Sequence, residues 1–319
     1  MTNDLTVKSA PVALPVSMQE AVEGLIGDSL SASTARAYRS DLAAFIAWCG
    51  QHDLAPVPSS PEVICSYIGH MAEAGKRASS ISRAIAAISC AHELKRVERN
   101  PCRDDLVKRA LKGMRRRVGT AQEKKAPATA SRVAAMLETL PDTLKGKRDR
   151  ALLALGFAGA FRRSELVALD MSDIEAVEGG ARVTIRKSKT DQTGEGQVIG
   201  IVDGVRLRPL AAVAEWVRAA GITSGPIFRS VDRHGNVSDA AMCDRQVARL
   251  VKDTAEAAGL DPEAFSGHSL RAGFITSAAA SGCDALRIAE TSRHKNMDIL
   301  RGYVRTENLT KNYAGAAFM

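Results

Sequence analysis

The chain has 319 residues, of which 45% are hydrophobic and 25% are charged. These fractions are typical of folded globular proteins, so they exclude a largely disordered chain, a collagen and a small disulfide-stapled protein. The 44 lysines and arginines against 36 acidic residues give a net charge of +8, which favours a polyanionic partner. At about 150 residues per domain, the length indicates two domains.

The longest apolar run covers residues 151–161, which is shorter than the roughly 20 residues needed to span a bilayer. The first residues, MTNDLTVKSAPVALPV, contain no basic segment followed by an apolar one, so we expect no secretory signal and a cytoplasmic protein.

The six cysteines lie at least 12 residues apart, so they form no metal-binding pair and are expected to be buried, reduced thiols. Since the chain has neither a phosphate-binding loop nor a dinucleotide motif, we expect no metal and no other cofactor.

The first third of the chain predicts helices over residues 17–30, 33–53, 60–75 and 79–95. The first opens with a capping box and the third with a serine cap followed by proline. Apolar residues recur at helical spacing in the other three. Those expected to face inward are Tyr38, Leu42, Phe45, Ile46 and Cys49 in the second helix, Ile64, Tyr67, Ile68 and Met71 in the third, and Ile81, Ile85 and Ile88 in the fourth.

Small hydroxyl and cationic side chains surround the start of the helix over 79–95. This composition suits a helix whose N-terminal end approaches phosphates or base edges in a major groove. A solvated polar face is the alternative, and the residue pattern alone favours it. The candidate DNA-binding residues, on this helix, on the second helix and in a basic run further on, are Arg36, Arg39, Lys76, Arg77, Ser79, Ser80, Ser82, Arg83, Arg115, Arg116 and Arg117.

Apolar periodicity is lost in RRRVGTAQEKKAPATA, which gains glycine, proline and lysine and therefore marks a linker. We expect a flexible tail over residues 1–15, a helical DNA-binding domain over 16–115, a basic linker over 116–130 and a second domain over 131–319. The second domain is expected to be mainly helical with a small antiparallel sheet, formed by β-rich runs over 181–190 and 196–202. Its helices are expected over residues 131–139, 146–159, 164–169, 209–220, 239–259, 268–281, 284–291 and 296–304.

Four separated segments of the second domain carry residues suited to phosphoryl chemistry without a metal: GAFRRSEL (159–166), KSKT (187–190), GHSLRAGF (267–274) and RHKNMDILRGY (293–303). Two arginines, Arg162 and Arg271, can hold the two non-bridging oxygens of a phosphodiester as their charge grows. Lys189, at the end of the first strand of the hairpin, can give a proton to the departing 5′ oxygen.

Tyr303 is the candidate nucleophile, and as a phenol it needs nearby cations and a base to become an attacking oxyanion. His268 lies three residues before Arg271 and is the candidate base, while His294 can hydrogen-bond the phosphoryl oxygen. Glu165 can support a histidine or an arginine from behind. Taken singly, each residue type is more often structural: a solvated arginine, a satisfied histidine or a packed tyrosine.

The order Arg, Lys, His-x-x-Arg, His, Tyr, with nine residues between the last two, resembles the catalytic set of the tyrosine recombinases, the phage integrase family. GAFRRSELVAL resembles the arginine motif of this family and indicates Arg162 rather than Arg163. KSKT resembles its β-hairpin motif and indicates Lys189 rather than Lys187. The rival nucleophile Tyr313 breaks the nine-residue spacing.

The resemblance implies a helical, SAM-like core-binding domain followed by an α+β catalytic domain, the two closing as a clamp around DNA. The implied activity is site-specific recombination through a 3′-phosphotyrosyl intermediate and a Holliday junction, without metal or ATP. The implied partners are duplex DNA with an inverted-repeat site and further copies of the chain, as a tetramer assembled through residues 308–319. A type IB topoisomerase, a telomere resolvase and a non-catalytic DNA-binding regulator on the same fold remain alternatives.

Overall fold

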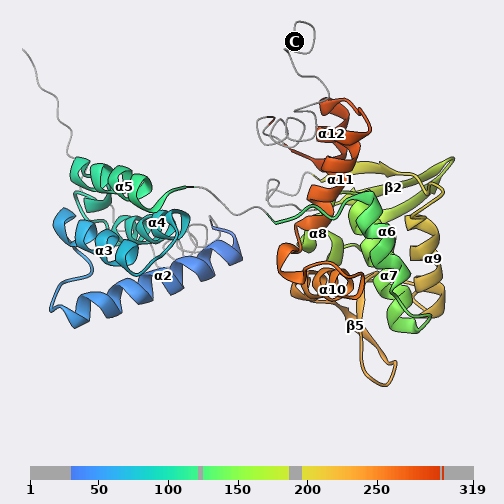
Figure 1. Cartoon of the computed structure of the whole chain (residues 1–319). Coiled ribbons are helices and arrows are strands. Elements are labelled where there is room, and N and C mark those ends of the chain that lie inside the picture. The colour runs from blue at the N-terminus through green and yellow to red at the C-terminus, as the bar shows by residue number, and fades with distance from the viewer. Residues whose placement is uncertain (1–29, 121–124, 187–195, 295–296, 298–319) are drawn as a thin grey trace, which may run out of the picture. The chain divides into compact units, whose positions relative to one another are not determined.

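The computed structural model divides the chain into two compact units, Met1–Glu123 and Lys124–Met319 (Figure 1). It is mainly α-helical with small antiparallel sheets in the second unit, which confirms the predicted fold class. The residues that the structure describes are 30–120, 125–186, 196–294 and 297.

Several sequence predictions fall on other residues. The helix predicted over 17–30 lies outside the described residues except for its last position, and the helix over 296–304 does so except for Met297. Lys189 and Tyr303 also lie outside them.

The first unit is a group of helices that begin where the sequence places caps. The side chain of Ser31 caps one helix by accepting from the backbone of Thr34, and Ser60 caps the next ahead of Pro61. Three of the predicted helices are confirmed. The helices are α2 (Ala32–Gln51), α3 (Pro61–Glu73), α4 (Ala78–Leu94) and α5 (Asp105–Val118), with a short turn η1 (Pro101–Arg103) before the last.

Aromatic rings form the centre of this unit. The ring of Tyr67 on α3 lies 4.9 Å from that of Phe45 and 5.1 Å from that of Trp48, both on α2. Ile46 was predicted to face inward, but 47% of it is exposed, because α2 turns the larger Trp48 into the core instead. Buried His92 is a satisfied structural histidine, since its Nδ1 donates to the Ile88 carbonyl and its Nε2 accepts from the Ser59 amide.

Helix α5 is a feature that the sequence reasoning missed. Only Val107 and Met114 on it are buried, and basic residues surround them in the sequence, so no apolar stripe indicates a helix there. It carries Arg115, Arg116 and Arg117 in its last turn and therefore continues into the region predicted as the start of the linker.

The second unit is built around α7, most of whose residues are buried. It packs against α6, α9 and α11, and Figure 1 shows α6, α7 and α9 alongside one another. The helices are α6 (Ala130–Glu138), α7 (Leu144–Ala158), α8 (Arg163–Val167), α9 (Pro209–Ala219), α10 (Asp244–Ala257), α11 (Ser269–Ala280) and α12 (Ala285–Ser292), with short turns η2 (Met171–Asp173) and η3 (Pro262–Ala264).

The strands are β1 (Ile174–Val177), β2 (Gly180–Ile185), β3 (Gln197–Ile201), β4 (Arg229–Val231) and β5 (Val237–Ala241). The first three form an antiparallel sheet in the order β1-β2-β3, and β4 pairs with β5. The predicted pairing of β2 with β3 is confirmed. Residues 239–241, predicted as helical, belong to β5 instead, because the Gln246 side chain caps α10 at Cys243.

The chain enters the second unit along an entry segment, residues 125–129, that is hydrogen-bonded to the region of α11. The amide of Ala126 donates to the Ala264 carbonyl, and that of Ala128 donates to the Ser269 carbonyl. A Cβ atom on Gly273 would lie only 1.7 Å from the Ala128 carbonyl oxygen. The glycine in the predicted motif is therefore required by this close backbone approach.

The cysteines are free, but they are not uniformly buried. Cys49 is buried as expected, whereas Cys243 and Cys283 are exposed, so the expectation of burial is wrong for these two. Cys243 lies just after β5 and Cys283 just after α11, in connections between elements at the surface. Among the described residues, no helix is long and apolar enough to cross a membrane.

Candidate active site

The carbonyl groups of Gly159 and Ala160, the two residues directly after α7, form the floor of the candidate site. A helix leaves its last carbonyls without partners and carries partial negative charge there, so it attracts cationic donors. Arg271 donates from Nη1 to the Ala160 carbonyl at 2.8 Å. Arg293 donates to the carbonyls of Gly159 and Ala160 at 2.9 and 3.0 Å. Two arginines distant in sequence from α7 are thereby held at its end.

Glu165 on α8 joins two of the arginines. Its Oε2 accepts from the backbone amide of Arg162 at 3.0 Å and from Nη2 of Arg293 at 2.9 Å, and its Oε1 accepts from the Arg162 guanidinium. Burial raises the pKa of this carboxyl, but Arg293 and the hydrogen bonds from Arg162 outweigh burial and leave its pKa lowered. Glu165 is therefore a buried carboxylate.

His294 lies beside Arg271, the second of the two arginines predicted to bind the phosphate. Its Nδ1 is 3.4 Å from Nη2 of Arg271 and 2.8 Å from Oγ of Ser292. Burial, followed by the positive charges of Arg271 and Arg162, lowers the pKa of His294 to about 4. The imidazole is therefore neutral at pH 7.

The structure thus brings four of the predicted site residues into one connected group: Arg162, Glu165, Arg271 and His294. Arg162 keeps 15% of its side chain exposed, whereas Arg271 as a residue is only 5% exposed. His268 is the residue directly before α11, and it is exposed. It precedes Arg271 by three residues at the same end of the same helix.

A groove adjoins this group on the side of the sheet. Residues of β3 and α12 line it, and its volume is ≈ 540 Å³. Gln197, at the start of β3, lines this groove together with His294. Because Gln197 pairs with Ile185 of β2, the ends of both strands that flank residues 187–195 lie close to this groove. Lys189 itself lies outside the described residues.

Arg293 belongs to this group, although the sequence reasoning did not identify it. It is 6% exposed and its guanidinium lies 5.2 Å from the centre of the Phe161 ring. No motif spacing marks it, since it directly precedes a histidine that was already assigned. The available signal was Glu165, a carboxylate directly followed by the apolar residues Leu166 and Val167, which required cationic partners once buried.

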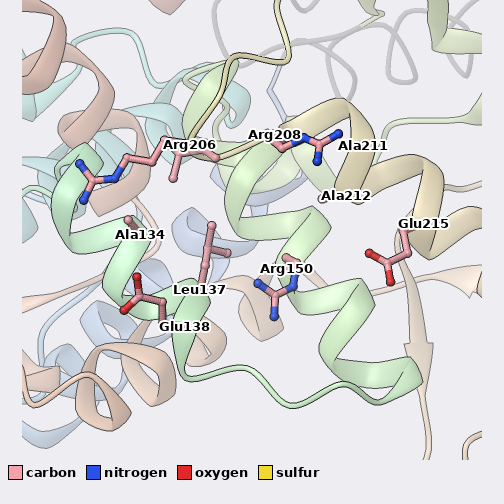
Figure 2. A pocket seen from close by; sticks show the side chains of 10 residues that line it. Ala134, Leu137, Glu138, Arg150, Arg206, Arg208, Ala211, Ala212 and Glu215 are labelled. Carbon is pink, nitrogen blue, oxygen red and sulfur yellow. The ribbon is translucent and has the colours of Figure 1, made fainter.

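A second pocket, of ≈ 320 Å³, lies over α6, α7 and α9 and shares no residue with the arginine group. Figure 2 shows Arg206 and Arg208 extending in opposite directions from the chain just before α9, with Arg150 on α7 below them. Glu138 and Glu215 line the same pocket. Its positive charges do not converge on one point, so it does not form an anion site.

The candidate DNA-binding residues of the first unit lie at its surface. Arg77 precedes α4 and its side chain makes no cap hydrogen bond, so α4 begins without a side-chain cap. Arg83 makes a two-bond ion pair with Asp41 of α2, at 2.7 and 3.0 Å. Arg36, Arg39, Lys76, Arg77, Ser79, Arg83, Arg115, Arg116 and Arg117 are exposed, and Ser80 and Ser82 are half-buried.

In the described ranges, no group of three or more histidine, cysteine or acidic side chains is placed to hold a metal ion.

Comparison with known proteins identifies both units. Residues 128–309 match the phage integrase family, and residues 22–96 match the N-terminal SAM-like domain of phage integrases. The chain is 35% identical over 317 residues to an integrase/recombinase xerD homolog of Selenomonas ruminantium, covering 98% of this chain and 93% of that protein. It is 26% identical over 286 residues to the tyrosine recombinase XerD of Staphylococcus aureus, covering 87% and 89%.

Solved structures of low sequence identity share the fold. A lambda integrase dimer bound to a COC′ core site superposes with a TM-score of 0.62 at 16% identity, covering 90% of this chain and 93% of that one. The XerH recombinase in a post-cleavage complex with its difH substrate gives 0.57 at 14% identity, covering 80% and 70%. The chain belongs to the phage integrase family and is a tyrosine site-specific recombinase.

Proposed function

We propose that the chain cleaves and rejoins duplex DNA through a covalent 3′-phosphotyrosyl intermediate. The observation that carries this proposal is the convergence of Arg162, Arg271 and neutral His294 at the end of α7. They come from separate parts of the chain, and packing alone does not require two guanidinium groups to meet a histidine there. A tetrahedral phosphoryl group developing charge needs such a set of donors.

Arg162 and Arg271 hold the non-bridging oxygens of the scissile phosphate. Glu165 and the Ala160 carbonyl fix these guanidinium groups, so their donors are in place before the substrate arrives. His294 donates a further hydrogen bond to the phosphoryl oxygen. As a neutral group, it does so without transferring a proton.

Tyr303 attacks the phosphorus and loses its phenolic proton to His268, which is exposed at the start of α11. The bond from phosphorus to the 5′ oxygen breaks, and Lys189 protonates that oxygen. Nine residues of chain tie Tyr303 to His294, a reach of about 30 Å at most. The pairing of Ile185 with Gln197 beside the His294 groove supports the assignment of Lys189.

A 5′ hydroxyl of the partner duplex then attacks the phosphotyrosine, which restores a phosphodiester and releases Tyr303. Because the ester conserves the bond energy, strand exchange through a Holliday junction needs neither ATP nor metal. We further propose that four copies assemble on two inverted-repeat sites, through residues 308–319, in the cytoplasm where the DNA lies. The lambda integrase structure, a dimer on a core site, and the XerH structure, a complex with a palindromic substrate, support a symmetric DNA partner.

We also propose that the helical DNA-binding domain over residues 16–115, within the first unit, reads the site, with the N-terminal end of α4 in the major groove. The uncapped amides there and the exposed Lys76 and Arg77 suit phosphate contacts. Basic side chains at the end of α5 and beyond, over residues 116–130, add sequence-independent contacts.

The test uses DNA whose site the protein itself selects. A pool of random duplexes is enriched for binding, each enriched duplex is nicked near its centre, and covalent protein on DNA is measured after denaturation. Accumulation of adduct at Tyr303 supports the proposal, and absence of adduct on every enriched duplex contradicts it. Products from two intact sites then separate strand exchange from simple relaxation or hairpin formation.

A further inference from the structure

Arg293 has a backbone conformation that side-chain-bearing residues rarely adopt. It ends α12 with φ 56° and ψ 43°, in the left-handed region that is usually occupied by glycine at helix ends. Its side chain is nevertheless only 2% exposed. A strained and buried arginine persists only where its contacts hold it firmly.

The contacts of Arg293 use the fork shape of its guanidinium. Nη1 donates to the carbonyls of Gly159 and Thr291 at 2.9 and 2.7 Å. Nη2 donates to the Ala160 carbonyl at 3.0 Å and to the Glu165 carboxylate at 2.9 Å. Nε is buried and has no hydrogen-bond partner among the described residues. A lysine ammonium, with one nitrogen, cannot span this set of acceptors.

These contacts join the parts of the proposed catalytic site. Through Glu165, Arg293 contacts the carboxylate that holds both the amide and the guanidinium of Arg162. Through the Ala160 carbonyl, it shares an acceptor with Arg271. Because Arg293 directly precedes His294, it also fixes the backbone from which the His294 side chain extends. At this exposure its guanidinium is too deeply covered to reach a bound phosphate.

We propose that Arg293 is a positioning residue that locks the end of α12 to the end of α7 and so sets Arg162 and His294 in one geometry for cleavage. This inference rests on the proposed function of that site. Because a shift of about 1 Å in a catalytic group can cost about 100-fold in rate, loss of this lock slows cleavage without loosening DNA binding.

The experiment compares Arg293→Lys, which keeps the charge, with Arg293→Gly, which removes both the guanidinium and the backbone strain. Arg208→Gly is the matched control, since Arg208 also has a positive φ, of 45°, in the same unit but 66% of its side chain is exposed. The probe is the nicked duplex selected above, and adduct formation is measured in a single turnover at saturating DNA.

Both Arg293 variants are expected to lose about 100-fold in cleavage rate, with DNA affinity changed by less than about threefold. Arg208→Gly is expected to cleave within about twofold of the parent. A purely structural role would lower the fraction of folded protein, so the rate is referred to the active fraction, from the final adduct yield. Arg293→Lys with a cleavage rate within about threefold of the parent overturns the proposal.

A double variant tests whether Arg293 acts through Glu165. If it does, Glu165→Gln combined with Arg293→Gly loses far less than the product of the single losses. Multiplicative losses overturn the proposal, because they mean that the two residues act independently. Should Arg293→Gly fail to fold, Arg293→Lys takes its place in this cycle. A parent chain that forms no adduct contradicts the proposed function, whereas equal rates for parent and Arg293→Lys overturn only the role of Arg293.

Discussion

Arg271 directs a donor nitrogen at Nδ1 of His294, at 3.4 Å. Nδ1 has two neighbours with opposite demands, because a guanidinium only donates hydrogen bonds, whereas Oγ of Ser292 at 2.8 Å must accept, since its own proton goes to the Ile288 carbonyl at 2.6 Å. Arg271 favours the tautomer with the ring proton on Nε2, and Ser292 favours the one with the ring proton on Nδ1. The proposed hydrogen bond from Nε2 to a phosphoryl oxygen requires the tautomer that the Arg271 contact favours.

The pH dependence of cleavage tests whether His294 stays neutral during the reaction. The pKa of His294 is lowered to about 4, so the group becomes protonated only below that pH and stays neutral above it. We expect His294→Gln, which keeps a donor, to give a rate profile of unchanged shape from about pH 5.5 to 8, measured as single-turnover adduct formation. An inflection near the ordinary histidine pKa that disappears in His294→Gln would show that His294 titrates during cleavage.

Removal of either phosphate-binding arginine is expected to slow cleavage strongly. Arg162→Ala and Arg271→Ala each remove donors to a developing charge, an effect typically worth about 3 to 4 kcal/mol, or roughly 10²- to 10³-fold. Adduct formation on the nicked duplex measures the loss. Arg182→Ala, which removes an exposed arginine of the same unit paired with Glu175 at 3.7 Å, is the control for net charge. Cleavage within about tenfold of the parent would remove Arg162 or Arg271 from the assignment.

Replacement of the nucleophile is expected to separate binding from chemistry. Tyr303→Phe loses only the attacking oxygen, so it should bind the selected duplex with parental affinity and form no adduct. The matched variant Tyr313→Phe should form adduct at the parental rate. The reverse pattern in denaturing gels would move the nucleophile to Tyr313.

Arg83 is expected to contribute to sequence preference rather than to general affinity. It is held by Asp41, and half of its side chain is exposed, so it is already oriented before DNA arrives. Arg83→Ala should cost about 1 to 3 kcal/mol at one base pair, while covalent cleavage of bound DNA survives. Selection of random duplexes by parent and variant measures this change.

Lys76 is expected to behave differently, as a phosphate contact. Lys76→Ala should weaken binding to all sequences alike and lower the slope of log affinity against log salt by about one. Lys95→Ala, at the opposite end of α4, is the control. If none of the substitutions from Lys76 to Arg83 changes affinity, slope or preference, this face is merely solvated. The face of α2 bearing Arg36 and Arg39 is then the better candidate.

Cleavage is expected to continue in excess EDTA. In the proposed mechanism the two arginines neutralise the phosphate charge that a divalent ion otherwise neutralises. Adduct formation is measured with EDTA at constant ionic strength, so that screening of the DNA does not change. Loss of activity that Mg²⁺ restores would contradict this mechanism.

The elements that sequence reasoning predicted well are those with an uninterrupted apolar stripe. Helix α4 places Ile81, Ile85 and Ile88 in the core as its spacing indicates. Helix α5 was not predicted because only two of its residues are buried, and basic residues lie between them and after the second. Strand β1 was not predicted because its residues are half-buried or exposed. It therefore lacks the alternation of apolar and polar residues by which a strand is recognised.

Within the candidate site, motif order identified the residues, but it did not indicate how they are held. The spacing of GHSLRAGF placed Arg271 on a helix, whereas its acceptor, the Ala160 carbonyl, depends on how α7 ends against α11. Arg293 depends on the left-handed backbone after α12, which no local pattern in the sequence indicates. Such long-range contacts follow from tertiary packing rather than from any single segment.

The hydrogen bonds of the entry segment define where an autonomous catalytic unit begins. Because Ala126 and Ala128 are bonded to the chain around the start of α11, and Ala128 covers Gly273, these residues belong structurally to the catalytic machinery. A proteolytic cut before residue 125 leaves the entry segment in place. A cut at Ala130, where α6 begins, removes the entry segment and uncovers the helix that carries Arg271. The functional boundary therefore lies a few residues ahead of the first helix of the unit.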